Sequence, residues 1–399
     1  MKRHLYILAL SLVLSMSAGC RYFSGTDDDN NILYYLTASA AAENVAQWAS
    51  VSAGYSHTLA IKNTGSLWAW GLNDFNQLGL GSDWSTKTTP VRIGFENDWS
   101  LVSAGTYHSL AVKKDTSLWA WGSNSYGQLS THDNDDRKRP VRISYLRRWS
   151  TVSAGGHHSM AIATSGELWA WGLNSSGQLG DGTTDNRNIM VQIGTDPEWT
   201  TVSAGLSHTL AIKKDGTLWA WGLNSSGQLG DGTFIDSADP VQINAESDND
   251  TDWLAISAGA THSLAIKKDG SLWAWGSDNW GQLGNGLEGS SPVPVWINDS
   301  MGWSAVSAGI LHSTALKNDG TLWAWGSNSM GQLGDGTYDG SDIPKQINFD
   351  NDWTKVSSGA YYTLSIKSEG YLFAWGSNNK GQLGDGTTIS SNEPVYIGE

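Results

Sequence analysis

Cysteine, proline and positive charge are all scarce in this sequence. The 399 residues include one cysteine and eight prolines, and 24 lysines and arginines stand against 39 aspartates and glutamates. A single cysteine excludes a disulfide within the chain. A net charge of −15 without a stripe of lysine or arginine argues against nucleic-acid binding, which needs cations to displace phosphate counterions. The same charge disfavours direct adhesion to an anionic membrane.

Long apolar runs are also rare, and the one near the start of the chain predicts export. Lys2, Arg3 and His4 precede an apolar stretch over residues 5–16, which is too short to span a bilayer. The following Ser17-Ala-Gly-Cys20 resembles a bacterial lipobox. We therefore predict a lipoprotein-type signal peptide at 1–19, a lipidated Cys20 and a tether over 20–47. The alternative is a general secretory signal that ends near a cysteine.

The residues after Cys20 bear on the compartment. Arg21 and Tyr22 follow, so no aspartate occupies the second mature position. If the protein is sorted like a lipoprotein of enteric bacteria, the lipobox-like segment without this aspartate implies export to the outer membrane. We expect a lipid-anchored protein of the cell envelope, at the outer membrane or cell surface, with the lipid as its only membrane contact.

Tryptophan, in contrast, is abundant and periodic. All but three of the 23 tryptophans recur in one register about every fifty residues, and only Trp84, Trp280 and Trp296 lie outside it. A repeat of this length indicates units that bury their apolar faces by stacking on their neighbours. The seven trios are Trp48, Trp68, Trp70; Trp99, Trp119, Trp121; Trp149, Trp169, Trp171; Trp199, Trp219, Trp221; Trp253, Trp273, Trp275; Trp303, Trp323, Trp325; and Trp353, Phe373, Trp375.

One copy of the repeat predicts one blade of a propeller. Residues 199–243 contain four short apolar runs bounded by Gly, Asp and Asn, which is typical of strands and turns. Asp215-Gly216 predicts a hairpin turn, and the small residues 202–205 suit a strand near a central axis. Pro240 cannot donate a ladder hydrogen bond, so its strand is expected at an edge. Seven copies predict an all-β, seven-bladed β-propeller over residues 48–399.

The repeat resembles a known family. Ser203-Ala-Gly-Leu-Ser-His208-Thr-Leu-Ala211 is followed by Leu218-Trp-Ala-Trp-Gly-Leu-Asn-Ser-Ser-Gly-Gln-Leu-Gly-Asp-Gly232. This pattern is similar to the regulator of chromosome condensation repeat, and the likeness extends from Trp48 to Ile397. The resemblance implies a seven-bladed propeller but says little about function, because one fold serves many roles.

Polar residues that recur from one copy of the repeat to the next are expected to be structural. One position holds histidine in six copies, too far apart for a single metal ion, so each is expected to hydrogen-bond backbone within its own blade. The seventh copy has Tyr362 there. Asp181 and its equivalents in Gly-Asp-Gly-Thr offer one carboxylate each, whereas calcium wants six to eight oxygens, so a turn is favoured. The acidic loop 246–252 is a candidate for weak calcium binding, with a solvated loop as the favoured alternative.

Enzymatic signatures are missing from the chain. The sequence has no cysteine nucleophile, P-loop, His-Glu-x-x-His motif or dinucleotide fingerprint. No pair of carboxylates can be placed as an acid and a base. We therefore expect no catalytic residue, no bound metal and no cofactor.

Two slots vary between otherwise fixed neighbours, and both fall in turns. Variable aromatics presented by turns of a rigid scaffold are typical of binding surfaces. The first slot lies just before the histidine position and the second just before Gly-Gln-Leu. The partner-binding candidates from these slots are Tyr55, Phe75, Tyr107, Tyr126, Trp280, Leu311, Met330 and Tyr361.

Three functions remain open at this point. The favoured hypothesis is a monomeric propeller that binds another protein through these residues. The second is a glycan-binding propeller that uses exposed Trp and Tyr as stacking platforms, and the third is a propeller-fold hydrolase or lyase. The alternative for each candidate residue is that it fills a local gap between blades.

Overall fold

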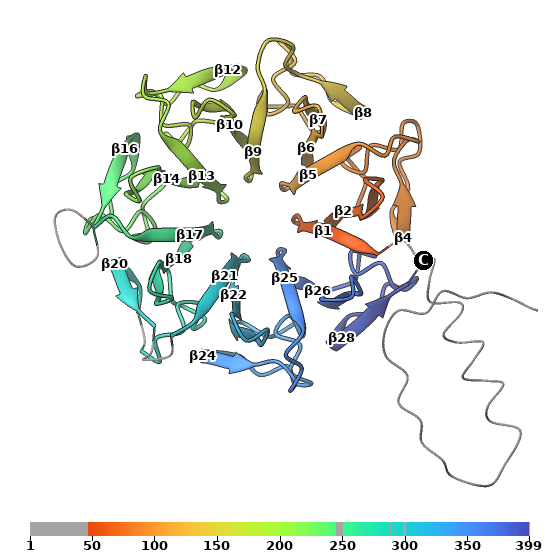
Figure 1. Ribbon diagram of the computed structural model, residues 1–399, viewed down its shortest axis with the longest axis vertical. Coiled ribbons are helices and arrows are strands. Elements are labelled where there is room, and N and C mark those ends of the chain that lie inside the picture. The colour runs from red at the N-terminus through yellow and green to blue at the C-terminus, as the bar shows by residue number, and fades with distance from the viewer. Residues whose placement is uncertain (1–46, 245–249, 288, 298–300, 399) are drawn as a thin grey trace, which may run out of the picture. The chain divides into compact units, whose positions relative to one another are not determined.

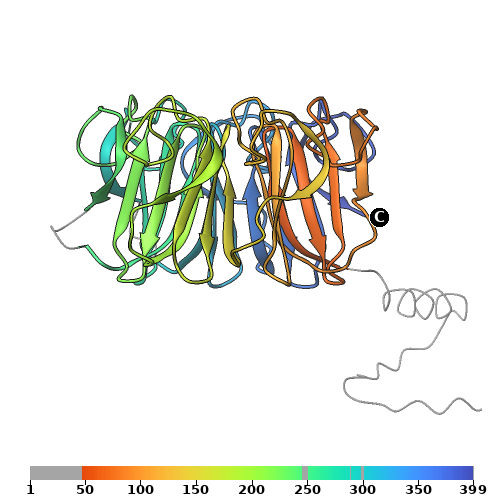
Figure 2. The same ribbon diagram turned by 90° about the horizontal axis from the view of Figure 1, so that it is seen from above.

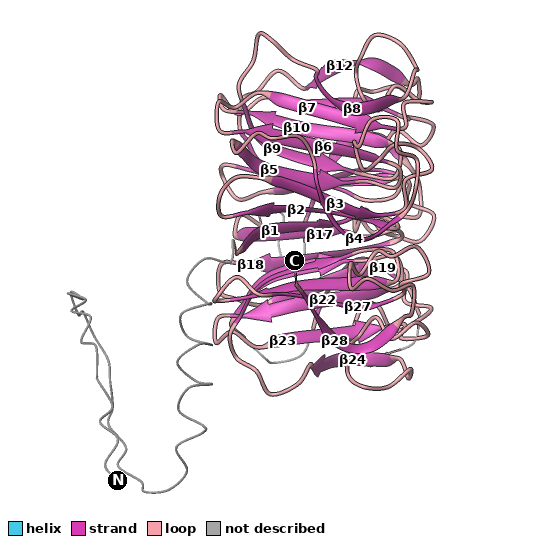
Figure 3. Cartoon of the chain, turned by 90° about the vertical axis from the view of Figure 1, so that its right-hand side faces the viewer, coloured by secondary structure: helices cyan, strands magenta, loops and turns pink. Residues whose placement is uncertain are grey.

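The computed structural model describes residues 47–244, 250–287, 289–297 and 301–398. The signal peptide and nearly all of the tether lie outside these residues. The described chain forms 28 strands in seven antiparallel four-stranded sheets around one axis (Figure 1). Within these ranges the secondary structure is strand and loop throughout (Figure 3), and no helix there could span a membrane.

Each sheet is one blade, and its four strands are consecutive in the chain. Blade 1 contains β1 (Trp48–Ala53), β2 (His57–Lys62), β3 (Leu67–Gly71) and β4 (Lys87–Arg92). Blade 2 contains β5 (Trp99–Ala104), β6 (His108–Lys113), β7 (Leu118–Gly122) and β8 (Arg137–Arg142). Blade 3 contains β9 (Trp149–Ala154), β10 (His158–Ala163), β11 (Leu168–Gly172) and β12 (Arg187–Ile193). Blade 4 contains β13 (Trp199–Ala204), β14 (His208–Lys213), β15 (Leu218–Gly222) and β16 (Ser237–Ile243).

The remaining three blades repeat the plan. Blade 5 contains β17 (Trp253–Ala258), β18 (His262–Lys267), β19 (Leu272–Gly276) and β20 (Ser291–Trp296). Blade 6 contains β21 (Trp303–Ala308), β22 (His312–Lys317), β23 (Leu322–Gly326) and β24 (Ser341–Gln346). Blade 7 contains β25 (Trp353–Ser358), β26 (Tyr362–Lys367), β27 (Leu372–Gly376) and β28 (Ser391–Ile397).

The turn and edge predictions made on the fourth copy are confirmed. The first strand of each blade is innermost and the fourth outermost, so Pro240 lies on an edge strand. Gly216 has a φ of +87°, and a methyl group there would lie 2.1 Å from the Thr251 carbonyl oxygen. Asp215 accepts a hydrogen bond from the Thr217 amide at 3.0 Å, which closes the turn. Glycine is therefore favoured at this turn, while Thr116 of blade 2 adopts the same left-handed conformation with a φ of +67°.

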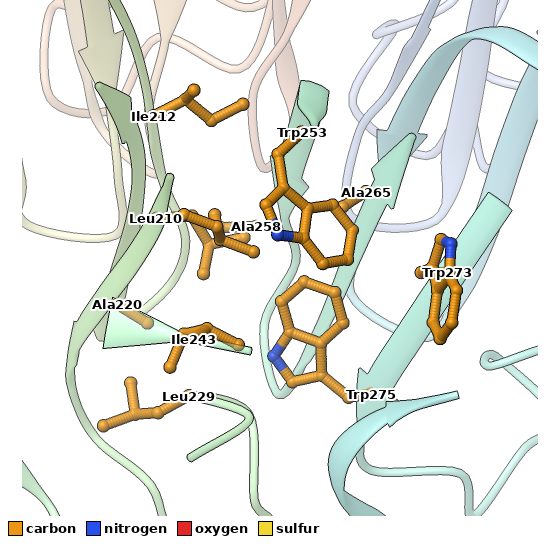
Figure 4. Packing of buried hydrophobic residues seen from close by; sticks show 11 residues of the cluster. Leu210, Ile212, Ala220, Leu229, Ile243, Trp253, Ala258, Ala265, Trp273 and Trp275 are labelled. Carbon is orange, nitrogen blue, oxygen red and sulfur yellow. The ribbon is translucent and has the colours of Figure 1, made fainter. Parts of the chain in front are cut away.

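The core consists of seven similar layers between adjacent blades. In the layer between blades 4 and 5, Leu210 and Ile243 of one sheet pack against Trp253 and Trp275 of the next (Figure 4). The tryptophans of one blade are thus buried by the aliphatic side chains of the preceding blade. Each layer needs two blades, so a single repeat has no core of its own.

A circle of hydrogen bonds joins the innermost strands. In each blade the amide after the inner-strand serine donates to the serine hydroxyl of the preceding blade, as from Ala258 N to Ser203 Oγ at 2.9 Å. The same bond closes the ring, from Ala53 N to Ser357 Oγ at 2.9 Å. The ring therefore closes without exchanging a strand between its first and last blades. The seven accepting serines are Ser52, Ser103, Ser153, Ser203, Ser257, Ser307 and Ser357.

The repeated histidines link neighbouring blades, and the prediction that each bonds its own blade's backbone is wrong. His208 Nε2 lies 2.9 Å from the Ser263 hydroxyl of blade 5. That hydroxyl donates to the Gln228 carbonyl, so the imidazole must donate and its Nε2 carries the proton. Gln228 also accepts a bond from Trp275 Nε1, at 2.9 Å. Equivalent bonds are made by His57, His108, His158, His262 and His312.

Burial keeps these imidazoles neutral. Desolvation lowers the pKa of His57, His158, His208 and His312 to about 3 and that of His262 to about 4. Within the described chain, the Nδ1 atoms of all six have no hydrogen-bond partner. A methyl group on Gly205 would lie 2.7 Å from His208 Cε1, so glycine is needed beside the ring.

The junction between the last and first blades uses tyrosine instead. The Tyr362 hydroxyl donates to the His57 carbonyl at 2.6 Å and lies 3.1 Å from Thr58 Oγ1. The ring is fully buried, and this burial raises the pKa of its hydroxyl. One of the seven junctions is therefore chemically different, and it is the junction between the first blade and the last blade.

Candidate functional site

The two faces of the ring carry different connections (Figure 2). We call the face with the first-to-second and third-to-fourth strand connections the loop face; in blade 1 these are residues 54–56 and 72–86. The opposite face carries the second-to-third hairpins and the links to the next blade, such as residues 63–66 and 93–98, and is called the linker face. Because the strands are antiparallel and consecutive, both variable slots open on the loop face.

The candidates of blades 1 and 2 gather into one cluster on the loop face. Phe75 and Tyr107 have ring centroids 4.6 Å apart, and Tyr55 lies 6.2 Å from Tyr107. His157 of blade 3 continues the row, 6.0 Å from Tyr107 and 5.1 Å from Tyr126. Side chains from three blades thus form an unbroken row, which we call the aromatic crescent: Tyr55, Phe75, Tyr107, Tyr126 and His157.

The crescent is partly open to solvent. Tyr55, Phe75 and Tyr126 expose 36–39% of their surface, whereas Tyr107 and His157 are half-buried between them. Burial lowers the pKa of His157, so this ring is neutral at pH 7. The cluster therefore offers aromatic edges and hydroxyls without a formal charge.

The crescent extends toward blade 7 through Tyr361. Burial raises the pKa of Tyr361, and the nearby Tyr55 adds a smaller contribution in the same direction. Trp280 and Met330 belong to the same slots of blades 5 and 6, and they expose 57% and 45% of their surface. Leu311 is half-buried on the same face.

Four slot positions of blades 3 to 5 hold a hydroxyl side chain instead. Ser176 and Ser226 occupy the positions of Phe75, while Ser207 and Thr261 occupy those of Tyr107. All four are half-buried. We call these four hydroxyl side chains the hydroxyl sector of the loop face.

A narrow hollow opens on the ring axis. Its volume is about 230 Å³, and its walls are the Ser-Ala-Gly ends of the inner strands. Tyr55, Leu206 and Ile310 stand at its mouth, so the crescent borders the hollow. A second hollow of about 570 Å³ lies at the border of blades 6 and 7, lined by Lys345, Phe349 and Phe373 among others.

Sequence reasoning overlooked His157 as a member of the crescent. It occupies the slot position of Tyr107, but its neighbour His158 directed attention to the buried histidine series. The shared face was also within reach of the sequence, because in a four-stranded meander the first and third connections always lie at the same end.

The polar loop motifs hold the loop face rigid. Asp181 Oδ1 accepts bonds from the Thr183 amide at 3.1 Å and from Asn174 Nδ2 at 3.0 Å. Asn174 Oδ1 accepts from the Leu179 amide at 2.9 Å. These carboxylates therefore serve as loop anchors, as the turn interpretation expects. In the described part of the chain no group of three or more His, Cys, Asp or Glu could hold a metal ion.

These features define a seven-bladed propeller built from tandem repeats, with a variable face. A family model described as RCC1-like domain matches residues 188–399, so the chain belongs to that family. Models of the regulator of chromosome condensation (RCC1) repeat match residues 64–112 and 115–162, and residues 48–77, 99–128 and 149–178. The family resemblance and the fold predicted from the sequence are both confirmed.

Curated relatives match short stretches only. The probable E3 ubiquitin-protein ligase HERC6 of Homo sapiens is 44% identical over 81 residues, which is 20% of this chain and 8% of that protein. The ultraviolet-B receptor UVR8 of Arabidopsis thaliana is 39% identical over 89 residues, or 22% of this chain and 20% of that protein. The match thus spans less than a quarter of either relative.

Solved structures match the whole ring. Human WBSCR16 has a TM-score of 0.76 at 20% identity, over 84% of this chain and 94% of that one. Yeast RCC1 (Prp20), in a crystal structure with Kap60 bound, has a TM-score of 0.75 at 19% identity, over 97% of this chain and 91% of that one. At such identities the likeness concerns the fold.

Proposed function

We propose that this protein is a lipid-anchored cell-envelope propeller that binds another protein through the aromatic crescent. The observation that carries the proposal is the unbroken row of ring contacts from Tyr55 to Tyr126 across three blades. Equivalent slots in blades 3 to 5 are occupied by Ser176, Ser207, Ser226 and Thr261, so the fold does not require aromatic side chains there. Aromatic anchors of this kind dominate the energy of many protein interfaces.

Ring geometry favours a protein over a glycan as the partner. A sugar stacks on the free face of a ring, but the crescent rings lean on one another with interplanar angles of 40–53°. Their exposed parts are edges and hydroxyls, which suit an irregular protein surface. A related precedent is the complex of yeast RCC1 with Kap60, although that complex says nothing of the surface used here.

The anchor in this proposal is Cys20, the only cysteine of the chain. One acyl chain binds a membrane marginally, while several hold firmly. Replacing Cys20 by Ser and fractionating cells should move the protein out of the membrane fraction. A mutant that stays with the membrane as the parent does would contradict lipid anchoring.

The binding face is tested by crosslinking and affinity capture from the native envelope. The variant Tyr107→Ala, Tyr126→Ala, Trp280→Ala should lose most of the captured partner, at least about tenfold, since each anchor contributes on the order of 1–2 kcal/mol or more. The matched control Ser176→Ala, Ser207→Ala, Ser226→Ala alters the hydroxyl sector and should retain the partner. Circular dichroism and thermal melting of both variants check the fold.

The same assay separates the alternatives. Because the crescent is uncharged, capture should change little between 0.1 and 0.5 M salt, in contrast to a binding site built on charges. Retention of the partner by the aromatic variant with unchanged affinity would rule out this face. Unfolding of that variant would show that the rings belong to the core. Release of the protein by a soluble polysaccharide would favour the glycan alternative.

A further inference from the structure

The linker face has its own set of exposed apolar side chains. Phe95, Leu146 and Phe349 are 93%, 93% and 99% exposed, and Tyr145 is 75% exposed. Each lies at the tip of a link between two blades, where it contributes nothing to either core layer. Single exposed apolar residues are ordinary, but these are nearly bare and share one face of the ring.

Their positions around the ring are consecutive. Phe349 lies at the border of blades 6 and 7, Phe95 at that of blades 1 and 2, and Tyr145 and Leu146 at that of blades 2 and 3. The border between blades 7 and 1 is where the described chain begins. There the Gln47 carbonyl accepts the Asn63 amide at 2.8 Å, and Trp48 N donates to the Gly370 carbonyl at 3.0 Å.

The chain therefore enters the ring on the linker face, between the apolar tips. Asn63 and Gly370 both belong to second-to-third hairpins, which places Gln47 on this face. Exposed apolar side chains lie on both sides of this entry point, at the border of blades 6 and 7 and at that of blades 1 and 2. We call this part of the linker face, with Phe95, Tyr145, Leu146 and Phe349, the tip sector.

The opposite side of the linker face differs. The link between blades 3 and 4 reads Thr195-Asp196-Pro197-Glu198, and all four residues are exposed. The described end of the link between blades 4 and 5 carries Asp250 and Asp252, which lie 3.0 and 3.6 Å from Lys267 Nζ. The exposed link between blades 3 and 4 is thus acidic, in contrast to the apolar tips near the chain entry.

The tip sector carries charges of both signs, including the exposed carboxylate of Glu96 beside Phe95. Asp98 pairs with Lys113 at 3.1 Å, while Asp350 and Asp352 pair with Lys367 at 2.8 and 3.1 Å. Arg147 and Arg148 are exposed beside Leu146. Arg147 also stacks on Trp169, with its guanidinium 3.8 Å from the ring centre. The acidic excess of the protein is therefore offset locally at this sector.

We propose that the tip sector rests on the lipid bilayer that holds the anchor, with its apolar side chains in the interfacial layer, so that, contrary to the expectation from the sequence, the lipid is not the only membrane contact. The inference rests on the proposed lipidation of Cys20, which lies 27 residues before Gln47. A chain of that length spans at most about 95 Å, so the ring stays close to the bilayer and weak insertion is enough to orient it. Aromatic and leucine side chains favour this layer. In this orientation the loop face and its crescent point away from the membrane.

The test places a reporter at the tips of the full-length, lipidated protein in phosphatidylcholine vesicles. The variants Phe95→Cys and Phe349→Cys are labelled with an environment-sensitive dye, because a lipidated Cys20 leaves no other cysteine to react. The matched control is Asp196→Cys in the acidic link. Dye at the tips should be blue-shifted and quenched by lipid-borne nitroxide several-fold more than dye at residue 196. Equal, water-like signals at all three sites would overturn the proposal.

A second variant keeps the test independent of the labelled positions. Phe95→Asp, Leu146→Asp, Phe349→Asp should remain membrane-bound through Cys20, yet a dye at Tyr145→Cys should lose its quenching. Unchanged quenching in this variant would overturn the role of the tips.

Failure of the anchor itself has a different signature. If mass spectrometry shows no acyl chain on Cys20, lipid anchoring fails and the tip proposal fails with it. If Cys20 is acylated and the tip dyes remain in water, only the tip proposal fails. Partner capture through the crescent is measured separately and depends on neither result.

Discussion

The interior junctions and the loop face of this propeller are built from the same seven repeats but differ in how strictly the repeats agree. At every junction a tryptophan and a hydroxyl of one blade donate to a glutamine carbonyl of the preceding blade, as Trp221 and Thr209 do to Gln178. On the loop face, in contrast, one and the same slot holds Phe75 in blade 1 and Ser226 in blade 4. Junction positions are fixed by a partner in the next blade, whereas a side chain that faces solvent is free to vary.

The largest expected effect concerns acid and separates the two regions most clearly. Six junction histidines have a folded pKa far below the value of about 6.5 that applies in the unfolded chain. Their contribution to stability is full above pH 6.5 and falls as the pH drops toward 3, because only the unfolded chain takes up protons. The loss approaches about 1.4 kcal/mol per pH unit for each histidine. Melting curves between pH 7 and 4 should show a steep fall in melting temperature.

The variant His208→Gln sharpens this test. It removes one of the six titrating groups, so the fall in stability between pH 6.5 and 4 should be shallower, whatever its effect at pH 7. A melting temperature that stays constant over this range in the parent protein would contradict neutral burial of the histidines.

The next largest effect compares two tryptophans. Trp221 is fully buried between blades 3 and 4, so Trp221→Ala should lower the free energy of unfolding by about 3–5 kcal/mol through lost burial and a residual cavity. Trp280 is 57% exposed on the loop face, and Trp280→Ala should change stability by less than about 0.5 kcal/mol. Chemical denaturation measures both values. Equal losses would erase the distinction between scaffold and surface.

The smallest effect concerns the junction where the ring closes. Tyr362→Phe removes the hydroxyl that donates to the His57 carbonyl and leaves Thr58 Oγ1 without that partner. The expected cost is about 1 kcal/mol, since the buried His57 carbonyl loses one of its two donors and keeps the Gly54 amide at 2.9 Å, while the ring still fills its space. Thermal melting checks the size of the loss. No change would mean that the hydroxyl is dispensable for closure.

Much of the architecture could be predicted from one repeat. Asp215-Gly216 indicates a hairpin because glycine adopts a positive φ without strain, and Pro240 belongs to the edge because it lacks an amide hydrogen. The trio of Trp199, Trp219 and Trp221 indicates stacking because no single sheet could bury it. These signals are local, so they are readable without knowledge of the neighbouring blade.

The partners across a junction could not be predicted in the same way. His208 and Ser263 are 55 residues apart, and their meeting depends on the stacking offset between two blades. The sequence shows that both residues recur in the repeats, but it does not show how far one blade is offset from the next. The expectation that each histidine bonds the backbone of its own blade was therefore wrong. The crescent illustrates the same limit, because the contact between Phe75 and Tyr107 also crosses a blade border.

By itself the sequence determined the number of blades, the order of strands within each blade and the residues that vary. Turn chemistry, side-chain alternation and the fifty-residue period act over a few residues or repeat unchanged, so they need no knowledge of distant contacts. Only the tertiary structure decided which atoms join one blade to the next, how the ring closes at Tyr362, and that the aromatic crescent forms one row. Those outcomes depend on the rotation and offset between stacked sheets, which are set by how all seven layers pack into a closed circle.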